Sequence, residues 1–132
     1  MFPANFGYFA VRSVEEALAL LTKHGDDARL LAGGHSLIPA MKLRLATPKY
    51  LIDLGTVPGL RGVRVDGNSL AIGALTVHAD VASSDLVRQR VPGLAEAASL
   101  IGDVQVRNRG TIGGSVAHND PAADFPVILL AL

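Results

Sequence analysis

Short apolar runs alternate with helical patterns along the first 54 residues of the chain. Apolar side chains dominate Tyr8–Arg12, Arg29–Ala32 and Tyr50–Leu54, which predicts three short and largely buried strands. Helices are expected in the two intervals between these strands. Because the order strand–helix–strand–helix–strand is typical of βαβ units, the three strands are predicted to run parallel.

The first helix carries its own start and stop signals. Ser13 and Glu16 match a capping box, in which the hydroxyl accepts from the third helical amide and the carboxylate reaches back. The apolar positions that follow at i, i+3, i+4 and i+7 are Val14, Ala17, Leu18 and Leu21. Gly25 stands where a C-terminal cap belongs. The second helix is predicted over Leu37–Leu45, with Ser36 as its cap.

The pattern changes after a Pro-Gly pair in Thr56–Leu60, where we place a boundary. Residues 1–57 are expected to form an N-terminal βαβ subdomain, and residues 58–132 a second subdomain. The second begins with two apolar runs, Gly62–Val65 and Leu70–Ala74, on either side of a Gly-containing loop. This arrangement predicts a β-hairpin.

The rest of the chain is predicted to be mainly helical. The expected elements are helices over Thr76–Val91, with a break at Ser83–Asp85, and over Pro92–Ile101, a strand over Thr111–Ala117, and a last helix from Asp120. The apolar run Val127–Leu132 ends without a polar tail. Because chain ends usually lie at the surface, we expect a piece of a longer polypeptide, with the second subdomain incomplete at its C-terminus.

Composition excludes several classes of function. Lys and Arg number 12 and so do Asp and Glu, which argues against a nucleic-acid binder or a polybasic membrane-surface protein. Cysteine is absent, so this chain carries no disulfide, thiolate nucleophile or cysteine-ligated iron–sulfur cluster. Its apolar runs fall well short of the ~20 residues of a membrane span. We expect a cytoplasmic protein.

Two segments with a Gly pair beside a hydroxyl, Ala32–Ser36 and Thr111–Ser115, are the main candidates for chemistry. The first follows a predicted strand and opens a predicted helix, where unpaired amides favour an anion. Glycine also lets a phosphate approach the backbone. Two such loops could bind both halves of a pyrophosphate, although neither matches G-x-G-x-x-G or a P-loop.

Other candidates are weaker. Gly34-His35-Ser36 begins like a nucleophile elbow, but Ile38 replaces the closing glycine. His118 and Asp120 lack a third metal ligand, and the other histidines, His24 and His78, form no i, i+4 pair. Arg107 and Arg109 fit solvated or acid-paired side chains, with an anion contact as the alternative. Asp124 fits either a favourable charge at a helix start or an acceptor for ribose or adenine donors.

Three stretches together, Ala32–Pro39, Lys42–Arg44 and Val106–Ser115, resemble the FAD-binding medium subunit of the molybdenum hydroxylases. This is the family of the carbon monoxide dehydrogenase and xanthine dehydrogenase flavoproteins. The resemblance covers essentially the whole chain. It implies an α+β fold rich in α/β structure, the PCMH-type FAD-binding domain, with an N-terminal βαβ subdomain, the start of a second α+β subdomain, and FAD between them.

The resemblance also implies which residues bind the cofactor. The residues that would wrap the FAD pyrophosphate are Ala32, Gly33, Gly34, His35, Ser36 and Leu37. Those that would contact it from the other side are Thr111, Ile112, Gly113, Gly114 and Ser115. Asp124 would bind the ribose or adenine end, and Ile101 would lie beside the cofactor. No side chain here is expected to act as an acid, base, nucleophile or metal ligand.

Family members work in complexes. The resemblance implies noncovalent FAD, electrons arriving from a 2Fe-2S small subunit, a molybdenum cofactor in a large subunit, and NAD or a quinone-like acceptor. Three alternatives stay open. A PCMH-type oxidase or reductase could attach FAD covalently through His35, a truncated chain could be a flavin-free assembly module, and an anion-binding regulatory domain would bind ADP as well as FAD.

Overall fold

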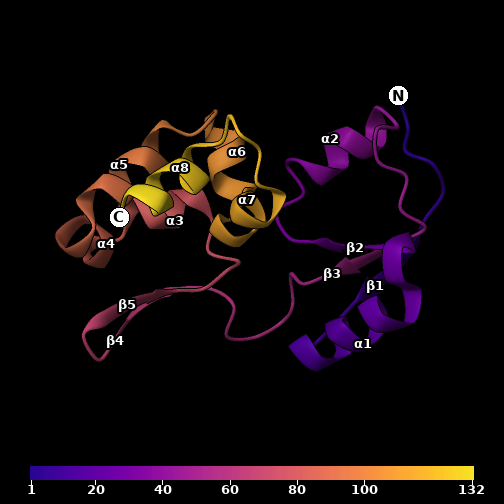
Figure 1. The fold of residues 1–132 in the computed structure, drawn as a ribbon, viewed down its shortest axis with the longest axis horizontal. Helices are drawn as coiled ribbons and strands as arrows, with labels where there is room; N and C mark the ends of the chain where they lie inside the picture. Colours follow the sequence, from indigo (N-terminus) through magenta and orange to yellow (C-terminus); the bar gives the residue numbers. More distant parts are fainter. The chain divides into compact units, whose positions relative to one another are not determined.

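The computed structural model describes residues 1–132, and the chain divides into two compact units, Met1–Pro58 and Gly59–Leu132. Figure 1 shows an α/β unit 1 and a mainly helical unit 2 that carries one hairpin. The division after Pro58 falls within the segment where the sequence pattern changes. Each unit is described by itself below.

Unit 1 is built on a parallel three-stranded sheet. Its strands are β1 (Gly7–Ala10), β2 (Ala28–Leu31) and β3 (Tyr50–Asp53), in the order β1-β3-β2. Each strand is four residues long, and β1 and β2 both pair with β3 over their whole length. The prediction of three parallel strands is confirmed. The two connections are the helices α1 (Val14–His24) and α2 (Leu37–Lys42), which lie on opposite sides of the sheet in Figure 1.

The caps of α1 form largely as the sequence predicts. Ser13 Oγ accepts a hydrogen bond from the Glu16 amide at 3.1 Å. The carboxylate of Glu16 reaches back to the amide of Arg12, at 2.8 Å, one residue earlier than a capping box requires. Gly25 has a φ of +53° and donates to Leu21 O, then opens the short 3₁₀ helix η1 (Gly25–Asp27). A positive φ at the C-cap favours glycine, which has no Cβ.

Helix α2 is shorter than predicted and begins differently. Ser36 stands at the N-cap position, but its side chain makes no capping hydrogen bond. The helix ends at Lys42 rather than Leu45, because Arg44 takes a left-handed φ of +57°. The amide of Leu45 then closes a wider turn onto Ala40 O at 2.8 Å.

In unit 2, the predicted hairpin forms from β4 (Val63–Asp66) and β5 (Ser69–Ile72), which pair antiparallel. The turn between them needs a left-handed residue, which Gly67 supplies with a φ of +57°. The hairpin prediction is therefore confirmed.

Six helices make up the rest of unit 2: α3 (His78–Ser83), α4 (Asp85–Arg90), α5 (Pro92–Leu100), α6 (Val104–Arg109), α7 (Ile112–His118) and α8 (Asp124–Ala131). Helix α5 packs against α3, α4 and α8. The core is formed by fully buried apolar side chains, among them Val81, Val87, Ala98 and Phe125. The predicted break between α3 and α4 is confirmed, with Ser84 Oγ accepting from the Val87 amide at 3.3 Å.

Two sequence predictions in unit 2 are wrong, and one helix has no counterpart among the predictions. The expected strand Thr111–Ala117 is helix α7, which begins at Ile112 with Thr111 as its N-cap. Helix α6 was not predicted, although Asp103 caps it by accepting from the Val106 amide at 2.9 Å. The last helix begins at Asp124 rather than at Asp120, because the Asp120 carboxylate accepts from the Ala122 amide at 2.8 Å and forms a turn before the helix.

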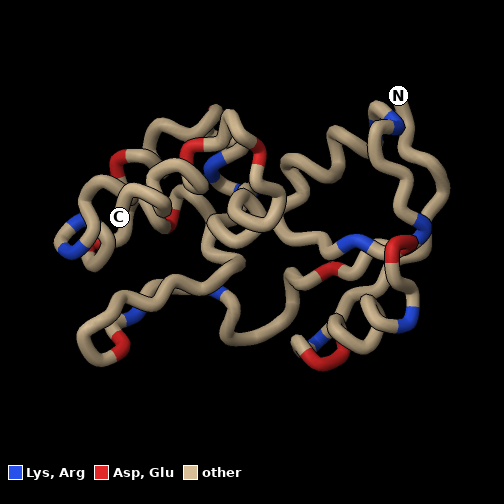
Figure 2. The backbone as a smooth tube through the Cα atoms, viewed as in Figure 1, with Lys and Arg blue, Asp and Glu red and all other residues tan.

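Charges of both signs are interspersed over each unit, as Figure 2 shows. Two ion pairs form, Lys49–Asp27 at 2.9 Å and Arg88–Asp85 at 4.0 Å, and all four side chains are substantially exposed. Such pairs contribute little to stability. No helix of the structure has the length and apolar character needed to cross a bilayer.

Candidate functional site

The first glycine loop leaves the carboxyl end of β2. Its start is fixed by a hydrogen bond from the Leu54 amide, just beyond β3, to Leu31 O at 3.0 Å. The chain then runs through Ala32–Ser36 into α2. The carboxyl edge of a parallel sheet is where α/β proteins commonly bind ligands, so this loop lies at a favourable place in the fold.

The loop presents a series of unused backbone donors. The five amides from Gly33 to Leu37 make no hydrogen bond within the chain, and the next amide, that of Ile38, bonds to Gly34 O at 3.0 Å. Gly34 has a φ of +78°, and a Cβ there would lie 3.1 Å from Ile38 Cγ1. Successive amides around a left-handed residue form a concavity that suits an anion. The loop therefore fits a phosphate group.

Two side chains of this loop are exposed, those of His35 and Ser36. His35 Nδ1 lies 3.3 Å from Gly33 O, so the imidazole folds back onto its own loop. The Ser36 hydroxyl has no partner within the chain and remains available as a donor. A hydroxyl beside unused amides adds to the capacity of the loop to bind phosphate oxygens.

The second glycine motif is physically different. Every amide after Thr111 in the motif already has an acceptor: Ile112 N bonds to Thr76 O at 3.0 Å, Gly113 N to Ala74 O at 2.8 Å, Gly114 N to Thr111 Oγ1 at 3.1 Å, and Ser115 N to Thr111 O at 3.0 Å. This motif therefore offers no unused amides at residues 112–115. Within residues 112–115, the group left available for a ligand is the Ser115 hydroxyl.

Close packing explains glycine at one position within this motif and at one position directly before it. A Cβ on Gly113 would lie 2.6 Å from both Cβ and O of Ala74. A Cβ on Gly110 would lie 2.6 Å from Nε2 of His78. Sequence reasoning interpreted Gly113 through phosphate approach and missed this packing role, for which the sequence offers no recognisable signal.

Asp124 and Ile101 occupy different environments in unit 2. Asp124 is the first residue of α8, is exposed, and makes no ion pair or hydrogen bond within the chain. Ile101 is half-buried, follows α5 directly and packs against the core. Helix α8 contacts α7, which begins directly after Thr111, so Asp124 and the second glycine motif lie on neighbouring helices.

The two arginines before the second motif have separate roles. Arg107 Nη1 donates to Ile101 O at 3.0 Å and to Gly102 O at 3.4 Å, which fixes the chain between α5 and α6. Arg109 is exposed and makes no ion pair or hydrogen bond. Neither arginine pairs with an acid, and Arg109 fits the solvated alternative that the sequence predicts. Arg107 instead binds carbonyl oxygens left open after a helix end.

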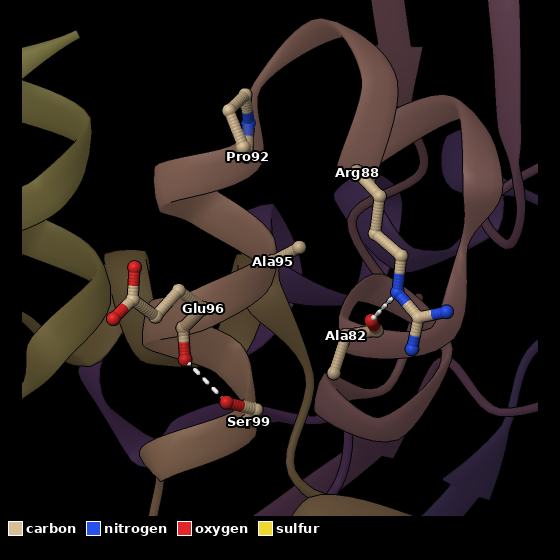
Figure 3. Close-up of a pocket in the computed structure, with 6 residues that line it drawn as sticks. All are labelled: Ala82, Arg88, Pro92, Ala95, Glu96 and Ser99. Atoms are coloured by element: carbon tan, nitrogen blue, oxygen red, sulfur yellow. Dashed lines mark hydrogen bonds between the residues drawn. The ribbon is translucent and has the colours of Figure 1, made fainter.

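A surface hollow of about 240 Å³ lies elsewhere on unit 2 (Figure 3). It is lined by residues of α3, α4 and α5: Ala82, Arg88, Pro92, Ala95, Glu96 and Ser99. Arg88 Nε donates to Ala82 O at 3.0 Å and Ser99 Oγ donates to Glu96 O at 2.6 Å, so both groups are already used. None of the residues expected to bind FAD lines this hollow. No three His, Asp or Glu side chains lie close enough together to hold a metal ion.

The family model described as the FAD binding domain in molybdopterin dehydrogenase matches residues 4–132. The carbon monoxide dehydrogenase medium chain of Hydrogenophaga pseudoflava is 56% identical over 132 residues, which is 100% of this chain and 46% of that protein. The 6-hydroxypseudooxynicotine dehydrogenase complex subunit alpha of Paenarthrobacter nicotinovorans is 51% identical, over 100% of this chain and 45% of that protein.

Solved structures agree with these sequence matches. The carbon monoxide dehydrogenase of Hydrogenophaga pseudoflava that lacks the Mo-pyranopterin moiety aligns with a TM-score of 0.95 and 58% identity, over 97% of this chain and 45% of that chain. Quinoline 2-oxidoreductase from Pseudomonas putida 86 aligns with a TM-score of 0.92 and 36% identity, again over 97% and 45%. The chain thus spans a little under half the length of these relatives.

Proposed function

Because the chain belongs to the family of FAD-binding domains in molybdopterin dehydrogenases, we propose that it forms the FAD-binding part of the flavoprotein subunit of a molybdenum hydroxylase. The subunit would pass electrons from a 2Fe-2S partner subunit to an external acceptor, either NAD or a quinone-like molecule. Substrate oxidation would take place at the molybdenum cofactor of a large subunit.

The observation that carries this proposal is the series of five unused amides from Gly33 to Leu37. An FAD pyrophosphate is an anion that needs several donors, and such a loop supplies them without side-chain charge. Gly34 holds the left-handed conformation that directs these amides into one concavity. The Ser36 hydroxyl adds a further donor.

We assign FAD binding to residues of both units, as the family resemblance of the sequence implies. In unit 2 the Ser115 hydroxyl would donate to the cofactor and Ile101 would give apolar contact. The unpaired carboxylate of Asp124 would accept from a ribose hydroxyl or an adenine amine. FAD supplies the electron-transfer chemistry when it is bound, and the residues of this chain bind and orient it.

The visible spectrum of the purified chain, recorded with added FAD and again after desalting, tests the proposal. A flavin band that stays with the protein is the expected result. Colourless protein that FAD does not stabilise against heat would contradict the proposal and support the flavin-free assembly module. Acid precipitation of loaded protein separates the modes of attachment: flavin in the supernatant is noncovalent, and flavin in the pellet indicates attachment through His35.

A matched pair of glycine variants tests the loop itself. Gly34→Ala and Gly25→Ala both place a Cβ on left-handed backbone in unit 1, so both lower its stability. Only Gly34→Ala alters the amide loop, because Gly25 lies at the end of α1 with no atom within 4 Å of the added Cβ. Loss of FAD binding in Gly34→Ala alone supports the assignment. Equal FAD affinity in the two variants contradicts it.

A further inference from the structure

Three segments of unit 2 that are distant in sequence form a backbone ladder. The Leu75 amide donates to Leu60 O at 2.7 Å and the Gly73 amide to Gly62 O at 2.9 Å. On its other side, the middle segment bonds to the second glycine motif, through His78 N to Gly110 O at 3.0 Å and the two bonds from Ile112 and Gly113 described above. Val77 and Thr111 form an antiparallel bridge within the same ladder.

The ladder is packed so closely that it excludes side chains at several positions. A Cβ on Gly73 would lie 2.5 Å from Leu60 O, and those on Gly110 and Gly113 would meet His78 and Ala74 at 2.6 Å. These distances are too short for any real Cβ atom. The position of the second motif is therefore determined by the middle segment, and a small movement of that segment would move the motif with it.

One side chain holds the middle segment to the base of the hairpin. Thr76 is only 1% exposed, and its Oγ1 accepts from the Gly62 amide at 3.0 Å while donating to Gly62 O at 3.1 Å. Its own backbone oxygen accepts from the Ile112 amide. Thr76 thus connects one segment through its hydroxyl and the other through its carbonyl.

We propose that Thr76 is a positioning residue for FAD binding. Through the backbone ladder it fixes the position of the second glycine motif, Thr111–Ser115, without touching the cofactor. This inference rests on the proposed function. Because residues 112–115 have no unused amides, the contribution of the motif depends on where the Ser115 hydroxyl lies. Loss of the buried Thr76 hydroxyl leaves the Gly62 amide without its acceptor and loosens the ladder at its centre.

Two variants at position 76 separate the hydroxyl from the shape of the side chain. Thr76→Val keeps the volume and removes the hydroxyl, whereas Thr76→Ser keeps the hydroxyl. We expect about tenfold weaker FAD binding for Thr76→Val, as for a lost buried hydrogen bond, and affinity within twofold of the unchanged chain for Thr76→Ser. Equal losses in both variants would overturn the proposal, as would unchanged affinity in Thr76→Val.

Two controls separate positioning from a general loss of stability. Val87→Ala removes core volume from α4, a helix that makes none of the hydrogen bonds of the ladder. Thr56→Val removes a comparable bond, from Thr56 Oγ1 to Val11 O at 2.8 Å, in unit 1. Each control is expected to lower the unfolding temperature and to keep its affinity for FAD, measured where all variants are folded. A loss of affinity in Val87→Ala equal to that in Thr76→Val would overturn the positioning role.

Amide hydrogen exchange of the FAD-free chain tests the ladder independently. In Thr76→Val the amides of Ile112 and Gly113 are expected to exchange faster, while the core amide of Ala98 keeps its rate. Unchanged rates at Ile112 and Gly113 would overturn the proposal, whatever the affinities are. If the unchanged chain fails to bind FAD, the proposed function and the role of Thr76 in binding both fail, and faster exchange would then establish a structural role alone.

Discussion

Tyr8 donates a hydrogen bond from its phenol to the carboxylate of Asp53, near the carboxyl edge of the unit 1 sheet. This bond, with burial and the nearby negative charge adding to it, raises the pKa of Tyr8 above its ordinary value of 10.0. A raised pKa means that the neutral phenol is favoured by folding. The resulting stabilisation is present below about pH 10 and is lost as the pH rises through the folded-state pKa.

We therefore predict that Asp53→Asn lowers the pKa of Tyr8 toward its ordinary value, because the amide carries no charge. The measurement is an alkaline titration of tyrosinate absorbance, which resolves well because the chain has two tyrosines. Tyr50→Phe leaves Tyr8 as the remaining chromophore and serves as the reference. An identical titration of Tyr8 with and without the Asp53 carboxylate would contradict the prediction.

His24 carries a buried polar atom without a partner. The centroid of its ring lies 4.1 Å from the ring centroid of Tyr50 and 5.6 Å from that of Phe9. Its Nε2 makes no hydrogen bond. We predict that His24→Phe raises the free energy of unfolding by about 1 kcal/mol, because the unsatisfied atom is removed and the aromatic contacts remain. Chemical denaturation at neutral pH measures this change. His118→Phe, at an exposed histidine, is the control and is expected to show no gain.

At the scale of elements, two helices offer the same substitution in different surroundings. Gly93 and Gly113 are each the second residue of a helix, α5 and α7. A Cβ on Gly93 meets only Ile128 at an ordinary 3.8 Å, whereas one on Gly113 meets Ala74 at 2.6 Å. We predict that Gly93→Ala changes stability by under about 1 kcal/mol, in the stabilising direction, through better helix propensity.

Gly113→Ala is predicted to destabilise unit 2 by about 2 kcal/mol or more, because the ladder has to move apart to admit the methyl group. Denaturation curves of the two variants under the same conditions give the comparison. Equal stability of Gly93→Ala and Gly113→Ala would mean that the close approach to Ala74 is relieved at little cost.

The elements that sequence patterns predict well are those with local signals. The parallel strands, α1 with its cap at Ser13, and the hairpin around Gly67 all follow from periodicity and turn chemistry within a few residues. The sequence does not predict helix α7, because its β-branched start and two glycines have low helix propensity. It forms because Thr111 caps it and because its first amides are fixed by Ala74 and Thr76, which are distant in sequence.

The candidate site shows the same division. The amides of the first glycine loop depend on one strand end and one helix start, both local, and the sequence identified that loop. In the second motif the roles of the amides depend on the ladder with the segment Ala74–His78. Sequence alone gives no signal of this difference, although the structure leaves a series of successive amides unused only in the first.

For the whole molecule, this difference predicts which part of FAD dominates binding. ADP carries the pyrophosphate and adenosine of FAD, whereas FMN carries the flavin with a single phosphate. If the amides of Gly33–Leu37 supply most of the binding, ADP should stabilise the chain and compete with FAD, and FMN should do neither. At a hundredfold excess over Kd, a ligand raises the free energy of unfolding by about 2.7 kcal/mol, which a shift in unfolding temperature detects readily.

We expect FAD to stabilise the chain most, ADP less, and FMN least. Gly34→Ala should abolish the effect of ADP, because this substitution alters the loop that binds the pyrophosphate. Stabilisation by FMN equal to that by FAD would place the main binding energy at the flavin and contradict the role given to the first loop. Equal stabilisation by ADP and FAD would favour an anion-binding regulatory domain over a flavoprotein, because the flavin would then contribute no binding energy to the complex.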